Sequence, residues 1–178
     1  MAVTAAQVKE LRELTALGVM DCKAALTESG GDVQKAIEVL RKKGIAFAAK
    51  RKERFTGEGR IGHYVHSNHK IGVLVELRCE TDFVASNAEF TALLKDLCMQ
   101  VAAARPLAVE RAKLAPEVIE KVSEPEREAF YKEACLLEQP FVKDPMITVK
   151  DRIDGVIAKL GENISVGRVV RLEVGRED

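Results

Sequence analysis

The fold is decided by one stretch of sequence, IGVLVELRCETDFVASN at residues 71–87. Its first part, 71–79, places apolar residues at every second position, which is the period of two expected for a half-buried strand. At its end, Ser86 and Glu89 have the spacing of a capping box, in which each side chain satisfies a backbone N–H at a helix start. The stretch therefore predicts a strand, a tight turn over 81–84 and then a helix.

The predicted turn contains an unexpected residue, because Phe83 follows Asp82 there. Turns favour polar residues, and an apolar ring normally belongs in the core. Two interpretations are open. In the first, Phe83 tucks under the start of the following helix as a hydrophobic staple. In the second, Asp82 and Phe83 are presented to a partner.

The rest of the second half of the chain supplies partners for this strand. A hairpin is predicted from strands over 61–66 and 71–79, and a helix follows over 87–104, ended by Pro106. Residues 107–139 read as further helix, interrupted by Pro116 and Pro125, and 138–145 read as a loop. Thr148 and Asp151 open a last helix with a capping box, Gly161 ends it, and regular alternation over 164–174 predicts a closing strand. Segregated strands and helices predict an α+β fold with a three-stranded antiparallel sheet.

Three short helices are predicted in the first part of the chain, over 4–15, 22–29 and 33–43, with Gly44 as the stop of the third. Their expected N-terminal caps are Thr4 with Gln7, then Asp21, then Asp32. The expected buried stripe of the first helix is Val8, Leu11 and Leu14. Such helices make a bundle with a small core, and the loop after the first exposes Leu17, Val19 and Met20. An exposed apolar loop on so small a bundle indicates a binding surface.

Composition sets further bounds. The chain has 178 residues, of which 47% are hydrophobic, enough for one sizeable core and a small accessory module. There is no long apolar run, so no membrane span is expected, and the first residues lack the pattern of a signal peptide. The four cysteines are widely spread, which favours reduced thiols in a cytoplasmic protein. They are Cys22, Cys79, Cys98 and Cys135.

The formal net charge is zero, but residues 41–54 hold seven basic side chains against one acidic one. A basic segment can bind RNA by neutralising phosphates, so an RNA-associated protein is the alternative function. A solvated helix face or linker explains the same charges without any nucleic acid, and this interpretation is preferred.

No set of residues predicts an enzyme. His63, His66 and His69 are spaced by three, but a strand and turn would point His66 away from His63, so no metal site is expected. The segment Gly57-Glu58-Gly59 lacks the Lys and Ser or Thr of a phosphate-binding loop. No histidine lies near a cysteine in a way that indicates a nucleophile. No cofactor is expected.

Two stretches closely resemble the signature regions of a known family. They are LRELTALGVMDCKAAL at 11–26 and ETDFVA at 80–85, and two further stretches, LLEQPFV at 136–142 and KLGENI at 159–164, also look like family sequence. On these residues the chain resembles bacterial translation elongation factor Ts over nearly its whole length. The resemblance implies a guanine-nucleotide exchange factor that binds elongation factor Tu, both GDP-bound and nucleotide-free. Such a factor disturbs the partner's magnesium and phosphate site and promotes exchange of GDP for GTP, without covalent chemistry.

The resemblance also implies how the chain is divided and which residues act. Residues 1–54 would form a helical domain, similar to a ubiquitin-associated domain, with the basic linker, and 55–178 an α+β core and dimerisation domain. Short family members have one core unit and pair as homodimers, and a three-stranded sheet with uncovered faces or edges favours pairing independently. Neither nucleic acid nor membrane is expected as a direct partner. The residues implied to contact elongation factor Tu are Arg12, Val19, Met20, Thr81, Asp82, Phe83 and Val84.

The chain departs from the family pattern in three places. Ala16 stands where the family usually has Gly, and Arg78 stands where Asn is common. The segment over 123–134 is short, because a helical insertion that normally precedes Gln139-Pro140-Phe141 is missing.

Overall fold

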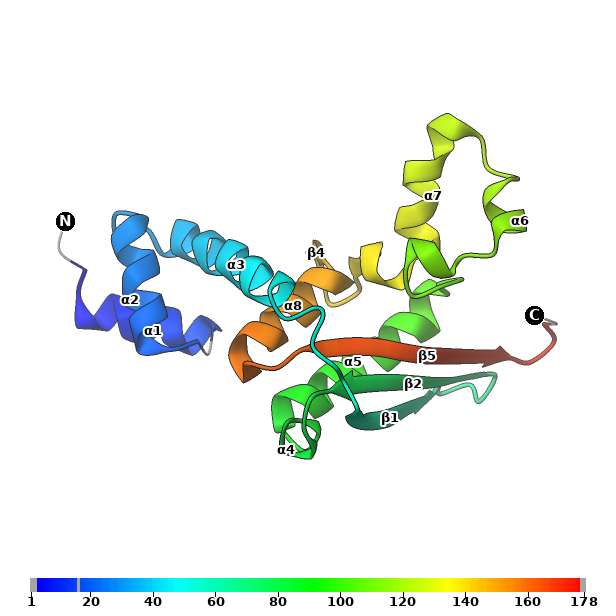
Figure 1. Ribbon diagram of the computed structural model, residues 1–178, viewed down its shortest axis with the longest axis horizontal. Coiled ribbons are helices and arrows are strands. Elements are labelled where there is room, and N and C mark those ends of the chain that lie inside the picture. Colours follow the sequence, from blue (N-terminus) through cyan, green and yellow to red (C-terminus); the bar gives the residue numbers. More distant parts are fainter. Residues whose placement is uncertain (1–2, 16, 177–178) are drawn as a thin grey trace. The chain divides into compact units, whose positions relative to one another are not determined.

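The computed structural model describes residues 3–15 and 17–176, and the chain divides into two units. Unit 1 holds the residues up to Glu53 together with Asp154–Glu162, and unit 2 holds Arg54–Ile153 together with the residues from Asn163 on. The predicted α+β class is confirmed: three helices come first in the chain, and a three-stranded antiparallel sheet with helices follows (Figure 1). No helix in the described ranges is long and apolar enough to cross a membrane.

Unit 1 is built on three helices and the end of a fourth. They are α1 (Ala5–Thr15), α2 (Val19–Glu28), α3 (Val33–Ala49) and the last residues of α8 (Val149–Leu160). The core between α1, α2 and α3 consists of small and aliphatic side chains, namely Leu11, Cys22, Ala25, Leu26, Ala36 and Leu40. Because this core is small, it buries little apolar surface, and the helix caps contribute a larger share of the stability of unit 1.

Two of the three predicted N-terminal caps in this part of the chain are confirmed. Thr4 and Gln7 exchange hydrogen bonds as a capping box, at 3.0 and 3.3 Å, and the Asp32 side chain accepts from the Lys35 N–H at 3.0 Å. The predicted Asp21 cap is wrong, because α2 begins earlier, at Val19, and Gly18 is its N-cap residue. Asp21 therefore lies in the first turn of α2, where its negative charge interacts favourably with the positive end of the helix dipole.

The predicted stop at Gly44 is also wrong, because α3 continues through it to Ala49. Gly44 is buried, and a Cβ at this position would lie 3.4 Å from the Cβ of Ala158 on α8. The glycine therefore allows two helices to approach closely within unit 1. Arg51, just after α3, stacks over the Phe47 ring at 3.5 Å and donates to the carbonyl of Gly161 at 2.9 Å.

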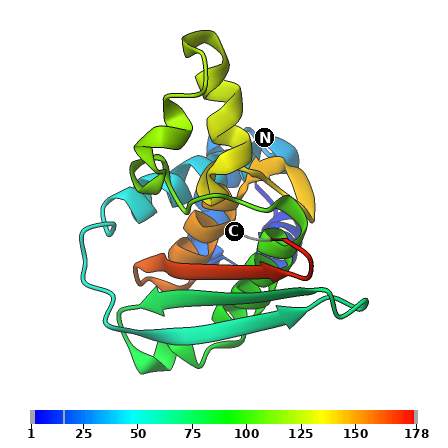
Figure 2. The same cartoon turned by 90° about the vertical axis from the view of Figure 1, so that its right-hand side faces the viewer.

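In unit 2, β2 is the central strand of the sheet, between β1 and β5 (Figure 2). The three antiparallel strands are β1 (Glu58–Val65), β2 (Ile71–Cys79) and β5 (Ile164–Glu173). Helix α5 (Ala88–Ala104) packs on one face, where a Cβ on Gly62 would lie 2.5 Å from Leu94. The side chains of β2 that face α5 form the centre of the core, which includes Val73, Val75, Leu77, Cys79, Phe90, Leu93, Leu97 and Val101.

The regular alternation predicted along β5 is wrong beyond its first residues. Val169 pairs with Val75 but Val166 pairs with Leu77, so an extra residue forms a bulge opposite Glu76. Ile164 and Val166 are buried. After the bulge, the residues that continue this every-second-residue pattern, Val170 and Leu172, lie on the opposite face of the sheet. The bulge thus adds Val170 and Leu172 to the open face of the sheet, which also carries the exposed apolar side chains of Ile61, Val65 and Leu74.

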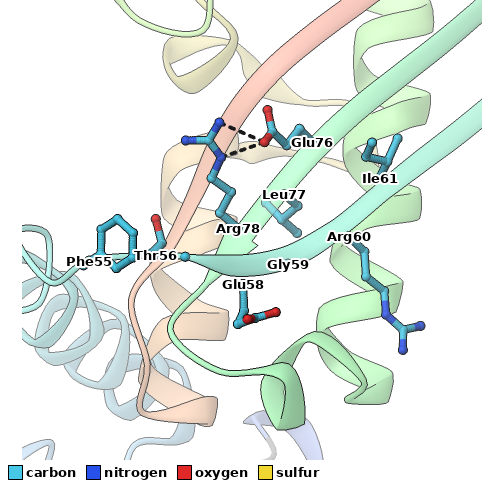
Figure 3. Close-up of a pocket in the computed structure, with 10 residues that line it drawn as sticks. Phe55, Thr56, Glu58, Gly59, Arg60, Ile61, Glu76, Leu77 and Arg78 are labelled. Atoms are coloured by element: carbon cyan, nitrogen blue, oxygen red, sulfur yellow. Dashed lines mark hydrogen bonds and ion pairs between the residues drawn. The ribbon is translucent and has the colours of Figure 1, made fainter.

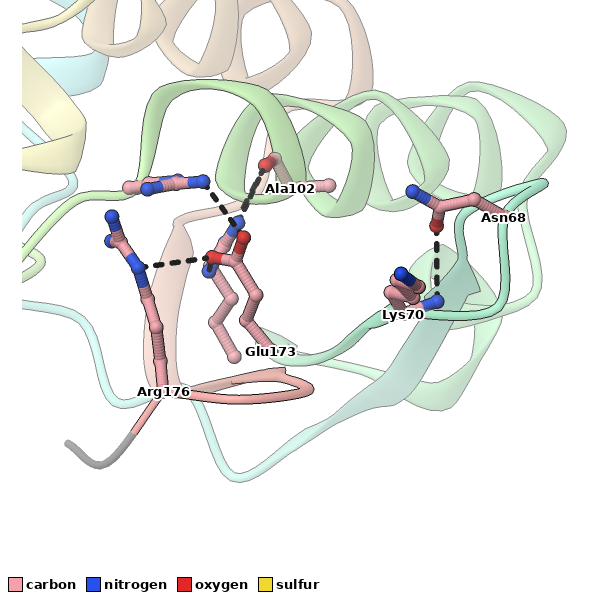
Figure 4. A network of polar contacts seen from close by, with 7 residues as sticks. Asn68, Lys70, Ala102, Glu173 and Arg176 are labelled. Carbon is pink, nitrogen blue, oxygen red and sulfur yellow. Dashed lines mark hydrogen bonds and ion pairs between the residues drawn. The ribbon is translucent and has the colours of Figure 1, made fainter.

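The end of β5 is tied to the end of α5 by a charged network around Glu173 (Figure 4). The Glu173 carboxylate accepts from Arg105 and from Arg171, both at 2.9 Å, and Arg176 lies 3.9 Å away. Arg171 also donates to the carbonyl of Ala102 at 3.4 Å. These contacts lower the pKa of Glu173, chiefly through the Arg171 hydrogen bond, so the network is ionised at neutral pH.

Between α5 and α8 the chain forms short elements instead of continuous helix. They are η1 (Arg111–Lys113), α6 (Pro116–Ile119), η2 (Glu124–Glu126), α7 (Arg127–Ala134), η3 (Leu136–Glu138), β3 (Pro140–Phe141) and β4 (Asp144–Thr148). The predicted interruptions at Pro116 and Pro125 are confirmed, since each proline lies in the first turn of a new element. The predicted loop over 138–145 is instead a small hairpin of β3 and β4. The Thr148–Asp151 capping box before α8 is confirmed, at 3.1 and 3.0 Å.

Candidate functional site

The predicted tight turn after β2 is a single helical turn, α4 (Asp82–Ala85). Thr81 is its N-cap, with an extended backbone, and its hydroxyl accepts from the N–H of Val84 at 3.4 Å. Ala85 is buried and closes the turn onto the body of unit 2. The sequence makes this turn because a Thr cap follows a strand and a small residue ends the helix.

Phe83 lies on the outer side of α4, and 84% of its side chain is exposed. Asp82 beside it is also exposed, whereas Thr81 and Val84 are partly buried. The interpretation of Phe83 as a staple under the next helix is therefore wrong. An aromatic ring held outward on a capped turn leaves apolar surface in water, which is typical of a contact site.

The capping box predicted from Ser86 and Glu89 is wrong, although the helix predicted to follow it, α5, is present. Asn87 caps α5, and its side chain accepts from the N–H of Glu89 at 2.8 Å. Ser86 instead ends α4, and its hydroxyl accepts from the Arg60 guanidinium at 3.0 Å. A cation at the C-terminal end of a helix is favourable, so Arg60 helps to hold the turn.

The other predicted contact residues lie in unit 1. Arg12 is exposed on α1, and Val19 and Met20 are exposed in the first turn of α2, with Met20 at 75%. Leu17 is partly buried against the core of this unit, so its predicted exposure is wrong. The predicted departure at Ala16 lies outside the described residues.

Leu14 is a further candidate contact residue, because it is 62% exposed and not part of the buried stripe of α1 as predicted. It precedes the last residue of α1, so exposed apolar side chains end α1 and begin α2. The exposure of Leu14 could be expected from the sequence, because an apolar residue in the last turn of a short helix has few core residues to pack against. Thus the structure groups Arg12, Leu14, Val19 and Met20 on α1 and α2 of one unit, and Thr81 to Val84 in one turn of the other.

A hollow opens beside the start of β1, lined by Phe55, Arg60, Glu76 and Arg78 among others (Figure 3). Within it the Glu76 carboxylate accepts from Arg78 at 2.8 Å, and from the backbone N–H of Arg168 in the β5 bulge at 3.0 Å. The hydrogen bonds from Arg168, then that from Arg78, lower the pKa of Glu76 from 4.5 to about 2. Glu76 is therefore ionised at neutral pH, which suits it to hold the bulge and not to donate a proton.

The histidines do not converge. His66 is hydrogen-bonded through Nδ1 to the Tyr64 hydroxyl at 3.0 Å, and His69 takes the positive φ of the hairpin turn. In residues 3–15 and 17–176, no group of three or more His, Cys, Asp or Glu side chains is arranged to hold a metal ion. The four cysteines, all within the described ranges, are buried and form no disulfide, and burial raises the pKa of the Cys98 thiol to about 11.

The basic segment over 41–54 is partly occupied by contacts within the protein. Lys43 pairs with Glu28 at 2.7 Å, Arg51 contacts Phe47 and Gly161, and Arg54 lies 3.5 Å from the Glu80 carboxylate. Charges used in this way are less available to neutralise phosphates, so the geometry favours a solvated, helical segment over an RNA site.

The exposed side chains on α1, α2 and α4 are therefore the candidate contact surfaces of this chain. A model of the family described as elongation factor TS matches residues 2–129 and 115–176. An elongation factor Ts of Nitratidesulfovibrio vulgaris is 47% identical over 199 aligned positions, which cover all of both chains. Those of Oleidesulfovibrio alaskensis and Carboxydothermus hydrogenoformans are 49% and 50% identical, covering 98% and 97% of this chain and 98% and 89% of theirs.

The chain belongs to the elongation factor Ts family. The expectation of a guanine-nucleotide exchange factor for elongation factor Tu, acting in the cytoplasm during translation elongation and not as an enzyme, is confirmed by this membership. The family model matches in two stretches that overlap over 115–129, and the 199 aligned positions exceed the 178 residues of this chain. That the missing residues form an insertion before Gln139 stays a prediction.

Proposed function

We propose that α4, with Thr81, Asp82, Phe83 and Val84, is the element that this exchange factor inserts near the magnesium and phosphate site of elongation factor Tu. The observation that carries the proposal is the exposed Phe83 ring on a capped turn. Burying such a ring in a partner contributes roughly 1.5–3 kcal/mol. That free energy stabilises a form of the partner that binds magnesium and GDP weakly.

A second surface supplies affinity in this proposal. Arg12, Val19 and Met20, together with Leu14, are exposed on α1 and α2 and are here called the unit 1 patch. In this proposal they bind the nucleotide-binding domain of elongation factor Tu. The helical domain over 1–54 and the core domain over 55–178 then divide the work: the first domain binds and the second displaces nucleotide. Both the GDP-bound and the nucleotide-free partner are bound, the latter more tightly.

Thermodynamic coupling provides the test. If the chain weakens GDP binding, GDP must weaken binding of the chain by the same factor in the equilibrium constant. Calorimetric titrations of the chain into nucleotide-free and GDP-bound elongation factor Tu should give affinities whose ratio equals the loss in GDP affinity caused by the chain. Equal affinities for both forms of the partner would contradict the exchange mechanism.

We further propose that two copies pair through the open face of the sheet. The support is a row of exposed apolar side chains, in which Val170 and Leu172, turned outward by the β5 bulge, join Leu74 of β2. A water-exposed apolar face of this kind is a liability for a monomer and is typical of an interface. Leu74 and Val170 are cross-strand neighbours, so the apolar surface is continuous across two strands.

Light scattering at micromolar concentration tests the pairing. The unmodified chain should have twice the mass of one copy, and Leu172→Lys should have the mass of one copy, because a charge in the interface is costly. Leu107→Lys is the matched control, since Leu107 and Leu172 are both 64% exposed but Leu107 lies outside the sheet. A monomeric unmodified chain, or a dimeric Leu172→Lys variant, would refute pairing through this face.

A further inference from the structure

The carboxylate of Glu80 joins three segments of unit 2 directly before the exposed turn. Its Oε1 accepts from the backbone N–H of Asn163 at 2.7 Å, and its Oε2 lies 3.5 Å from Nη1 of Arg54. The Asn163 side chain donates in turn to the carbonyl of Arg54 at 2.8 Å. These three residues, here called the Glu80 junction, connect the end of β2, the segment before β1 and the residue before β5.

The Glu80 junction continues the sheet beyond its last backbone pair. Cys79 pairs with Ile164 at the end of the β2–β5 ladder, so Glu80 and Asn163 are next in register. There the Glu80 side chain takes the place of a backbone partner for the Asn163 N–H. Asn163 is buried, and the Glu80 side chain is only 22% exposed, so this charge-assisted hydrogen bond is partly shielded from water.

Thr81, the cap of α4, is the residue directly after Glu80. We infer that Glu80 is a positioning residue for nucleotide exchange, which fixes the base of the turn that carries Asp82 and Phe83. This inference rests on the function proposed above. A turn that inserts into a partner should be rigid before it binds. Otherwise the free-energy cost of ordering the turn reduces the binding free energy gained by burying the Phe83 ring.

Of the two contacts of Glu80, the hydrogen bond from Asn163 carries more weight. It is short and shielded, whereas the Arg54 pair is longer and its arginine is about half exposed, and exposed ion pairs contribute little. A neutral acceptor of the same length should therefore replace the carboxylate well. A shorter carboxylate should not, because it withdraws the acceptor from the Asn163 N–H.

The test measures GDP release from elongation factor Tu as a function of chain concentration, which separates the half-saturating concentration from the maximum release rate. Glu80→Ala should lower the maximum rate about tenfold, the scale expected for loss of a charge-assisted hydrogen bond. Its half-saturating concentration should change less than about threefold, because the unit 1 patch is intact. Glu80→Gln should stay within about threefold of the unmodified chain, and Glu117→Ala, an exposed site on α6, should not differ from it.

Glu80→Asp keeps the charge but shortens the side chain, so it tests positioning even where the alanine variant does not fold. The inference predicts a lower maximum rate for Glu80→Asp than for Glu80→Gln. Maximum rates equal to that of Glu117→Ala in both the alanine and the aspartate variants would overturn it, while leaving the exchange function standing. If the unmodified chain does not accelerate GDP release, the proposed function itself fails, and the inference fails with it.

Discussion

The hydroxyl of Thr81 accepts a hydrogen bond from the backbone N–H of Val84 at 3.4 Å, and this contact starts the helical turn on which Phe83 is exposed. A single hydrogen bond between residues three positions apart thus stabilises the turn that holds the Phe83 ring in solvent. The strand before the turn and the helix after it fix both of its ends.

Removal of this cap should loosen the turn without unfolding the protein. Thr81→Ala should cost about 1 kcal/mol locally, which corresponds to roughly fivefold faster amide hydrogen exchange at Val84. Thr81→Ser keeps the hydroxyl and should retain the protection. Exchange rates at Val84 that are the same in the alanine variant and the unmodified chain would show that the cap does not hold the turn.

Gly44 should be intolerant of a large side chain. Its Cβ position is 3.4 Å from the Cβ of Ala158, so Gly44→Leu would force α3 and α8 apart within unit 1. We expect a destabilisation of about 1–3 kcal/mol, measured by thermal unfolding with circular dichroism. Ala46→Leu, at an exposed position of the same helix, is the control and should be close to neutral. Equal melting temperatures for the two variants would contradict the close approach at Gly44.

Gln100 holds the β3–β4 hairpin from inside the core. Its fully buried amide donates to the Gln139 side chain and the Pro140 carbonyl at 3.1 and 3.2 Å, and accepts from the Val142 N–H at 2.8 Å. Gln100→Met has a similar volume but leaves these groups without their partner, so urea unfolding should show a loss of about 1–3 kcal/mol. Gln34→Met, on an exposed position of α3, should leave the midpoint unchanged.

Glu76 should make stability depend on acid pH. Its pKa is lowered to about 2 in the folded chain from an ordinary 4.5, so its stabilising effect is fully present above pH 4.5 and is lost as the pH falls toward 2. Urea unfolding between pH 2 and pH 7 should show Glu76→Gln less stable than the unmodified chain at neutral pH, with the difference vanishing near pH 2. A difference that does not change with pH would mean that the charge of Glu76 is not responsible.

Much of the fold could be predicted because local chemistry and tertiary structure agree. The alternation over 71–79, the caps at Thr4, Asp32 and Thr148, and the proline interruptions each follow from contacts within a few residues of sequence. The class of fold then follows from the order of the elements.

Two of the errors occurred where a distant contact overrides a local signal, whereas the caps at Asp21 and Ser86 were misplaced within a few residues. Gly44 has the sequence of a helix stop but serves close packing against Ala158, and the bulge opposite Glu76 reverses the faces of β5. The outward ring of Phe83 could not be derived from spacing alone, because staple and contact residue share the same sequence pattern. Only the exposed fraction in the folded chain separates the two.

The most direct measurement is stopped-flow release of a fluorescent GDP analogue from elongation factor Tu in the presence of Phe83→Ala, with Phe55→Ala as the matched control. Both rings are more than four-fifths exposed, at 84% and 87%, but only Phe83 lies on α4. Loss of roughly 1.5–3 kcal/mol of ring burial should slow stimulated release by about 10- to 100-fold for Phe83→Ala, with an unchanged circular dichroism spectrum. Phe55→Ala should release GDP as fast as the unmodified chain, whereas equal rates for Phe83→Ala and the unmodified chain would contradict insertion of the Phe83 turn.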